Sequence, residues 1–417
     1  MNRTRKNFLD ENIYYHELKN GLRIVHKQQA SDIVYCGFIT DCGTRDEQPS
    51  EHGMAHYVEH LLFKGTSKRS SRQIINRIEF IGGELNAYTT KEETVIYAAC
   101  LKEYFSRTLE LLADMTFHSA FPQPEIKKEL SVICDEIDSY KDSPSELIFD
   151  DFETLLYPDH PLGNAILGTP ESIATFTSES ITAFRNRNYI PAQTVFFSQG
   201  DIPFRHVIKL AEQYMECIEP KTTKTRIKAP ESISCNKHET IQKDTHQIHY
   251  ICGGKGYNIY DSKRIGFILL NNILGGPGMN SKLNLSLRER RGLVYTVESN
   301  YSALSDCGWW SIYFGCDPEN AIRCEELVFK ELKELRSKPI NPIMLNRYKR
   351  QLRGQMAIAA QIQENTVQNM GKSVLRFGHV IPWSDFFRQI DECTPEAMLA
   401  IANEIYSEEN INTLKYI

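Results

Sequence analysis

The residues of this sequence best suited to chemistry form one short cluster, His56, Glu59 and His60, within residues 51–65. The two histidines are four residues apart and Glu59 is three residues from His56, so on an α-helix all three side chains project from one face. Two imidazoles placed in this way can bind one metal ion, and zinc accepts neutral histidine nitrogens. A carboxylate next to a ligand can reach a metal-bound water as general base.

The order H-x-x-E-H is the inverted zinc-binding motif of the inverzincins. In a chain of this composition an accidental match occurs in roughly a few per cent of cases, so the motif needs support from its context. His52 and His56 are also four residues apart and form an alternative pair of ligands. No carboxylate follows them at the catalytic spacing, and Gly53 lies between them, so we favour the pair His56 and His60.

The elements that must position this cluster can be read from the periodicity around it. Apolar neighbours predict that the metal-binding helix is buried, and Gly65 suits its end. Upstream, the Asn20-Gly21 turn predicts a β-hairpin, and a third strand leads through a polar loop to the helix. The segments predicted in this region are strands 14–18, 22–26, 33–40, 84–90 and 94–100 and helices 71–81, 102–117 and 124–140.

The helix predicted at 124–140 carries two acidic residues that bear on the metal site. Pro124 and Glu125 suit a helix start, and Glu129 and Glu136 share one face because they are seven residues apart. A glutamate on a helix is by default a solvated surface residue, so this spacing alone gives neither of them a role.

Composition divides the chain into two domains and a linker. A strand at 194–198 closes a first domain, 1–217, and residues 218–245, rich in Lys, Thr, Pro, Glu and Ser, form the predicted linker. In 246–417 a strand, polar loop, helix and glycine stop repeat the order seen from 33 to 65, which indicates a weak internal duplication without the metal histidines. The segments predicted in this half are a strand at 248–252, a helix at 262–274, aromatic strands through Trp309, Trp310 and Tyr313, and helices at 318–336, 341–373 and 394–406.

Composition also excludes several classes of function. An apolar content of 41% and a charged content of 24% describe an ordinary soluble globular protein, and the net charge of −6 indicates no nucleic-acid partner. No segment approaches the about 18 consecutive apolar residues of a membrane span. Residues 1–11 lack the apolar core of a signal peptide, and the 11 cysteines include no C-x-x-C pair. We therefore expect a cytoplasmic protein with no membrane partner.

These motifs together resemble those of the M16 metallopeptidases, in particular the short two-domain subfamily that includes the mitochondrial processing peptidase subunits and their bacterial relatives. The resemblance covers nearly the whole chain. It implies an α+β fold of two structurally similar domains, each a mainly antiparallel sheet packed with helices. The matching segments are 53–66, 86–89, 93–94, 160–163, 168–172, 189–191 and 287–295, together with Glu129 and Glu136.

The resemblance implies one zinc ion per chain and assigns its ligands. Glu136 follows His60 at the spacing of the family's third zinc ligand, so His56, His60 and Glu136 form the expected ligand set. Glu59 is then the general base that takes a proton from the attacking water and returns it to the leaving amine. Glu129 corresponds to the carboxylate that supports the site from behind.

The resemblance also implies substrate-binding residues. Arg288 and Tyr295 match the arginine and tyrosine that the family's second domain brings to the substrate carbonyl. Asn86 and Ala87 begin an edge strand to which a peptide can add through backbone hydrogen bonds. The glycine loop at 275–278 departs from the family pattern because it contains a proline and is followed by Met279-Asn280.

The expected activity is that of a zinc-dependent endopeptidase or oligopeptidase acting on peptides or unfolded segments in a closed chamber. Family members close two halves of two domains each, whereas this chain has two domains that carry both the zinc motif and the pair Arg288 and Tyr295. We therefore expect a homodimer in which this pair acts in trans. One alternative is a non-catalytic scaffold or partner subunit, although no metal or base residue is missing. Another is an enzyme that matures one dedicated peptide.

Overall fold

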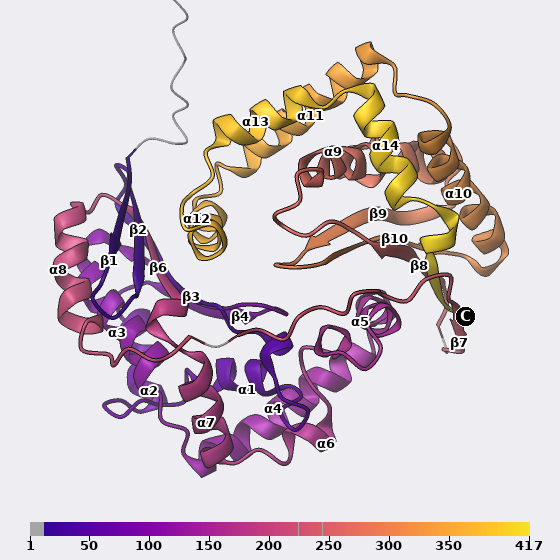
Figure 1. The fold of residues 1–417 in the computed structure, drawn as a ribbon. Coiled ribbons are helices and arrows are strands. Elements are labelled where there is room, and N and C mark those ends of the chain that lie inside the picture. The colour runs from indigo at the N-terminus through magenta and orange to yellow at the C-terminus, as the bar shows by residue number, and fades with distance from the viewer. Residues whose placement is uncertain (1–11, 224, 244) are drawn as a thin grey trace, which may run out of the picture. The chain divides into compact units, whose positions relative to one another are not determined.

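The computed structural model describes residues 12–223, 225–243 and 245–417, and these residues form two compact units (Figure 1). Unit 1 runs to Ile137 and adds Ala165–Ile227 and Ile358–Trp383. Unit 2 comprises Asp138–Asn164, Lys228–Ala357 and Ser384–Ile417. Each unit thus includes a segment from the other half of the sequence, which composition did not indicate. The basic start at residues 1–11, on which the expectation about a leader rests, lies outside the described residues.

Unit 1 is built on one sheet, six-stranded in the described part of the chain. Its strands are β1 (Ile13–Glu17), β2 (Arg23–Gln28), β3 (Ile33–Thr40), β4 (Glu84–Thr89), β5 (Thr94–Leu101) and β6 (Thr194–Gly200). Their order is β1-β2-β6-β3-β5-β4, with β2 and β6 parallel and the other neighbours antiparallel. The β1–β2 hairpin confirms the turn prediction, and Gly21 adopts the φ of 87° that favours glycine. β4 is an outermost strand, as the resemblance implied.

Helices cover both faces of this sheet. They are α1 (Met54–Leu61), α2 (Ser71–Glu79), α3 (Phe105–His118), α4 (Gln123–Lys141), α6 (Pro170–Ile173), α7 (Ser178–Asn188), α8 (Phe204–Met215) and α12 (Gln363–Phe377). Phe38 and Ile96 face the core formed with α1 and α3, whereas Ile39 and Val95 face the opposite side, where Val367 of α12 packs. This alternation follows from the two-residue period of a strand.

Unit 2 is built on a second mixed sheet, with five strands among the residues described. Its strands are β7 (His238–Ile241), β8 (Ile248–Lys255), β9 (Val294–Ala303), β10 (Gly308–Cys316) and β11 (Asn412–Tyr416). Their order is β7-β11-β8-β10-β9, with β7 and β11 parallel and the rest antiparallel. The mainly antiparallel α+β architecture that the resemblance implied is therefore confirmed in both units. β7 lies within 218–245, the segment predicted as the linker.

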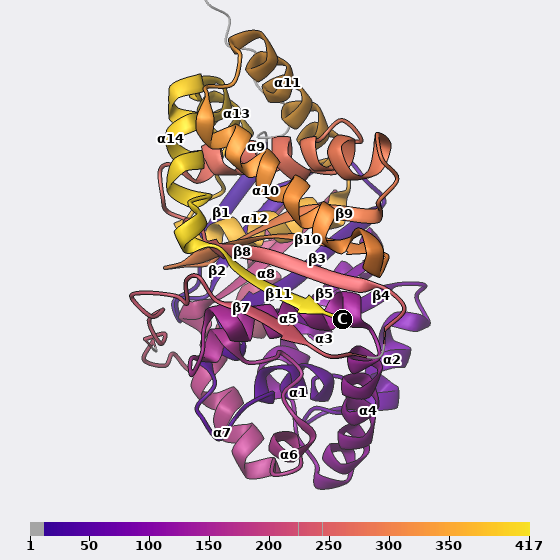
Figure 2. The same cartoon turned by 90° about the vertical axis from the view of Figure 1, so that its right-hand side faces the viewer.

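The helices of unit 2 pack on both faces of its sheet (Figures 1 and 2). They are α5 (Pro144–Leu156), α9 (Arg264–Gly275), α10 (Ala321–Ser337), α11 (Pro342–Ala359), α13 (Trp383–Glu392) and α14 (Pro395–Ile405). Along β10, Trp309 and Tyr313 face the core shared with α5, and Trp310 and Ile312 face the core shared with α9, α10 and α14. The aromatic run therefore supplies two cores in alternation.

The single long helix predicted at 341–373 is wrong. The structure has α11 and α12 instead, separated by a break at 360–362, because α11 belongs mostly to unit 2 whereas α12 packs on the sheet of unit 1. The apolar periodicity continues across the break, so it gave no sign of the interruption. Among the helices in the described ranges, none has the length and apolar character needed to cross a bilayer.

Candidate metal centre

The start of helix α1 is held by a buried carboxylate and a pair of touching glycines. Glu47 accepts hydrogen bonds from the backbone N–H groups of Gly53 (3.0 Å) and Ala55 (2.8 Å), which lack partners within the helix. Gly53 has a φ of 90°, and a Cβ atom on it would lie 2.8 Å from Cα of Gly168. Two sequence segments of the family resemblance thus meet at this point, and their contact determines where α1 begins.

Helix α1 is fixed to α4 by packing and by one hydrogen bond. The hydroxyl of Tyr57 donates to the carbonyl oxygen of Ile126 at 2.5 Å, one turn before Glu129. The buried face of α4 repeats at helical spacing and includes Glu129 among apolar residues, namely Ile126, Ile133 and Ile137. The two carboxylates of α4 therefore reach the histidines of α1 from a helix whose position is set by its own core.

The structure brings His56, His60 and Glu136 together. Oε2 of Glu136 lies 3.8 Å from Nε2 of His56 and 3.5 Å from Nε2 of His60, and the three donor atoms lie within 4.8 Å of one another. Two imidazole nitrogens and one carboxylate oxygen form a donor set that suits a catalytic zinc ion. His52 precedes α1, and its Nε2 lies 3.1 Å from the carbonyl oxygen of Ala165, so it is not part of this group.

Burial and charge act differently on the two histidines. Burial, and then the neighbouring His60, lower the pKa of His56 to about 3, so this ring is neutral at pH 7. Its Nδ1 is buried without a hydrogen-bond partner in the described part of the chain. Burial also lowers the pKa of His60, but Glu129, Glu59 and Glu136 outweigh this effect and raise it. A dication requires ligands without a proton, which suits the neutral ring of His56. It is also stabilised by negative charge, which the carboxylates around His60 supply.

Glu129 lies behind His60 and is itself paired with a cation. Its Oε2 lies 3.2 Å from Nδ1 of His60, and its Oε1 lies 2.7 Å from Nζ of Lys64. Burial raises the pKa of Glu129, but the hydrogen bonds with His60 and Lys64 outweigh it and lower the pKa. An ionised Glu129 orients His60 with Nε2 toward Glu136. Sequence reasoning gave Lys64 no role, although its position four residues after His60 was a signal that it could lie nearby.

Glu59 contacts a residue of the sheet that sequence reasoning also left without a role. Its Oε2 accepts a hydrogen bond from the hydroxyl of Thr89, at the end of β4, at 2.7 Å. Glu59 is buried, and burial raises the pKa of its carboxyl group. No local pattern could have identified Thr89, because a contact between a helix and a strand 30 residues later depends on packing.

The residues expected to bind substrate lie on two outer strands, except for Arg288, which precedes one of them. Asn86 and Ala87 are on β4, and Asn86 is exposed. Tyr295 is the second residue of β9 with 78% of its surface exposed, and Arg288 is exposed near the end of a short π-helical turn (Asn284–Glu289). Because the histidines lie in unit 1 and this pair lies in unit 2, the expectation that they act at one site stays a prediction.

The glycine loop at 275–278 is flanked on both sides by residues that are hydrogen-bonded to α11. Asn280 and Gln351 exchange two amide hydrogen bonds of 2.9 and 3.0 Å, and Asn272 donates to Gln355 at 2.9 Å. Met279 is 70% exposed between these anchors. The departure from the family pattern at this loop therefore coincides with side-chain contacts that hold it against a helix.

Both halves of the chain match sequence profiles of one known protein family. Residues 23–170 match the sequence profile described as "Insulinase (Peptidase family M16)", and residues 175–352 match "Peptidase M16 inactive domain". The chain is 32% identical to an uncharacterized zinc protease of Bacillus subtilis, covering 94% of this chain and 95% of that protein. An uncharacterized zinc protease of Rickettsia felis is also 32% identical, with 96% of both chains covered.

Solved structures show the same fold. A protease from Helicobacter pylori superimposes with a TM-score of 0.89 at 20% identity, covering 97% of this chain and 99% of that one. A structure from Pseudomonas fluorescens, described as a peptidase M16 inactive domain, superimposes with a TM-score of 0.87 at 21% identity, covering 97% and 98%.

Proposed function

Because the chain belongs to the insulinase family of peptidases, family M16, we propose that it is a zinc-dependent endopeptidase or oligopeptidase that hydrolyses peptides or unfolded segments in a closed chamber. The observation that carries this proposal is the convergence of His56, His60 and Glu136 beside a buried Glu59. A scaffold subunit is the alternative. It has no need of these four side chains, and the chain retains all of them.

His56, His60 and Glu136 would hold one zinc ion per chain, and Glu129 would keep His60 in the orientation that binds it. The ion, when bound, supplies a Lewis acid that activates water and polarises the scissile carbonyl. Glu59 takes a proton from the attacking water and passes it to the leaving amine. A buried carboxylate with a raised pKa is suited to this exchange, because it can hold the proton between the two steps.

Two further groups act on the substrate in this proposal. Asn86 and Ala87 lie on the outermost strand of the sheet of unit 1, where an extended peptide can add as a further strand. Arg288 and Tyr295 stabilise the oxyanion that forms on the scissile carbonyl, and loss of one such donor costs about 10² to 10³ in rate. Both side chains are exposed and therefore available to a bound peptide.

We also propose that the protein is a homodimer in which Arg288 and Tyr295 of one subunit serve the zinc site of the other. A mixed dimer of Glu59→Gln and Tyr295→Phe chains should then recover part of the activity that each parent lacks. Recovery no better than either parent contradicts the trans arrangement. For the compartment we propose the cytoplasm, which the 11 cysteines support: all lie within the described residues, where none forms a disulfide.

Cleavage of an internally quenched peptide of about 10 to 20 residues tests the activity. We expect the zinc-loaded wild type to turn the peptide over and the Glu59→Gln variant, prepared identically, to lose at least about 10²-fold in kcat. Turnover at the wild-type rate by Glu59→Gln contradicts its role as base. Absence of turnover in both proteins, with zinc bound, favours the scaffold alternative. A peptide-library cleavage profile separates broad activity from maturation of one dedicated peptide.

A further inference from the structure

Thr89 connects the general base to the strand proposed to bind the peptide. The hydroxyl of Thr89 donates to Oε2 of Glu59 at 2.7 Å, and hydrogen bonds to a carboxylate are stronger than those between neutral groups. Thr89 is the last residue of β4, three residues after Asn86 and two after Ala87. The same short strand therefore carries the backbone on which a peptide is expected to add and a side chain that holds the base.

The turn after Thr89 is fixed to the segment that leads into α1. The N–H of Thr90 donates to the carbonyl oxygen of Glu93 at 2.8 Å and closes the β4–β5 hairpin. The N–H of Thr44 donates to the carbonyl oxygen of Thr90 at 3.2 Å, and that of Arg45 donates to Lys91 at 2.9 Å. Thr89 and Glu59 are thus positioned by two backbone segments that are bonded to each other, which limits their relative motion.

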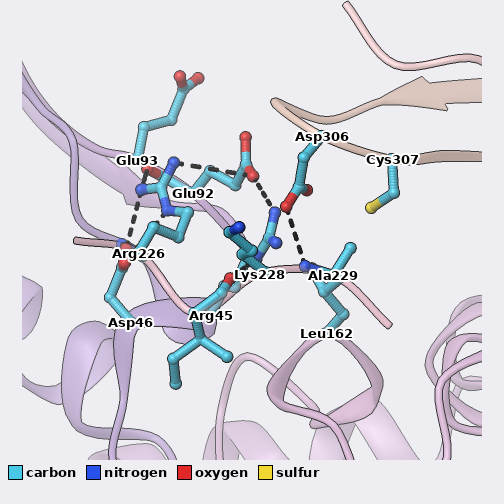
Figure 3. Close-up of polar contacts among 12 residues, drawn as sticks. Arg45, Asp46, Glu92, Glu93, Leu162, Arg226, Lys228, Ala229, Asp306 and Cys307 are labelled. Carbon is cyan, nitrogen blue, oxygen red and sulfur yellow. Dashed lines mark hydrogen bonds and ion pairs between the residues drawn. The ribbon is translucent and has the colours of Figure 1, made fainter. Parts of the chain in front are cut away.

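Buried ion pairs strengthen this connection (Figure 3). Arg45 donates to the carboxylate of Glu92 at 2.6 Å, and the two side chains are 0% and 5% exposed. Arg226 donates to the carboxylate of Asp46 at 2.9 Å and to the carbonyl oxygen of Glu92 at 2.8 Å. Figure 3 shows Arg226 between Asp46, which precedes α1, and Glu92, which lies in the hairpin turn. Since breaking such buried pairs is costly, the turn has little freedom to move away from the helix.

We propose that Thr89 is a positioning residue of the peptidase reaction, whose hydroxyl holds Oε2 of Glu59 and thereby makes Oε1 the oxygen that exchanges the proton. The inference rests on the proposed function. One proton moves from the attacking water to Oε1 and then to the leaving amine, while Thr89 keeps its own proton and donates to Oε2 throughout. Glu59 begins and ends the cycle as a carboxylate.

The proposal separates the effect of Thr89 on rate from its effect on binding. The backbone of Asn86 and Ala87 is unchanged when the side chain of Thr89 is replaced, so peptide binding should be retained. The carboxylate of Glu59, without its hydrogen bond, can rotate and is less often aligned with the water. Loss of Thr89 should therefore lower kcat and leave KM nearly unchanged, which is the signature of an interaction used in the transition state.

The experiment compares Thr89→Val, which has nearly the same shape but no hydroxyl, with Thr89→Ser, which keeps the hydroxyl. Full-length, zinc-loaded proteins are assayed with the quenched peptide, and zinc affinity is measured by chelator competition. We expect Thr89→Val to lower kcat about 10- to 100-fold with KM within about threefold, and Thr89→Ser to recover most of the rate. Zinc affinity should stay within about twofold, because Thr89 contacts no ligand. Thr240→Val, at an exposed strand position, is the matched control.

A stability cycle provides a readout that does not depend on turnover. We expect Thr89→Val to lower the midpoint of thermal unfolding in the Glu59 protein and to have no such effect in a Glu59→Ala background. Equal shifts in both backgrounds, equal losses of rate for Val and Ser, or a loss of zinc affinity each overturn the positioning role. An active wild type with full turnover by Thr89→Val overturns this inference alone. An inactive wild type overturns the proposed function and this inference with it.

Discussion

Replacing Glu129 with glutamine tests whether the buried carboxylate behind His60 contributes to zinc binding. The substitution keeps the shape of the side chain and an oxygen that can accept from Nδ1 of His60, but it removes the negative charge. In the structure this charge lies 3.2 Å from His60 and 2.7 Å from Lys64, with the Glu129 side chain only 5% exposed.

The expected loss follows from these contacts. A hydrogen bond to a charged group contributes about 1.5–3 kcal/mol and a neutral one about 0.5–1.5 kcal/mol, so removing the charge costs roughly 1–2 kcal/mol at His60. Lys64 is 28% exposed and can turn toward water, so we add no large penalty for it. At about 1.4 kcal/mol per factor of ten, Glu129→Gln should weaken zinc binding roughly 10-fold and at most about 100-fold.

The assay is competition for zinc with a chromophoric chelator at pH 7 and fixed ionic strength, with circular dichroism to verify the fold. Glu125→Gln is the matched control, because Glu125 lies on the same helix and pairs with Lys128, which is 67% exposed. Such a surface pair contributes little, so the control should bind zinc like the wild type. If Glu129→Gln binds zinc within about twofold of both proteins while folded, the support assigned to Glu129 is wrong.

Three further predictions concern stability in urea or heat. Gly53→Ala should destabilise the protein by more than about 2 kcal/mol, because Gly53 has a φ of 90° and the added Cβ atom would lie 2.8 Å from Cα of Gly168. Gly82→Ala also has a positive φ, but its Cβ atom would enter open space, so it should cost only about 1 kcal/mol. Similar losses for the two variants would show that the glycine contact is unimportant. Burial lowers the pKa of His26 to about 4, below the unfolded value of about 6.5. The contribution of neutral His26 to the free energy of unfolding should therefore be fully present above about pH 6.5 and fall by up to about 3 kcal/mol as the pH drops toward 4. A urea midpoint of His26→Asn that varies with pH as strongly as that of the wild type refutes this. Arg45→Met removes the 2.6 Å partner of the buried Glu92 carboxylate but leaves Arg226 and Arg376 within 3.7 Å of it, so it should destabilise by about 1.5–3 kcal/mol, and a loss below about 0.5 kcal/mol contradicts a strong Arg45–Glu92 pair.

Several features of the fold and of the metal centre could be predicted because they depend on residues close together in the chain. The grouping of His56, Glu59 and His60 follows from the 3.6-residue period of a helix, and the shared face of Glu129 and Glu136 follows from the same geometry. The β1–β2 hairpin follows from its turn residues. In each case the backbone geometry over about seven residues or fewer determines which side chains meet.

The tertiary structure alone decided which distant segments share a core and a site. Helical periodicity continues from α11 to α12, yet α12 packs on the sheet of unit 1, because apolar residues define a buried face without specifying what covers it. The hydrogen bond from Thr89 to Glu59 has the same origin, since it joins a strand and a helix whose separation depends on packing. The sequence by itself determined which groups can bind a metal, whereas the fold determined which other side chains hold those groups in place.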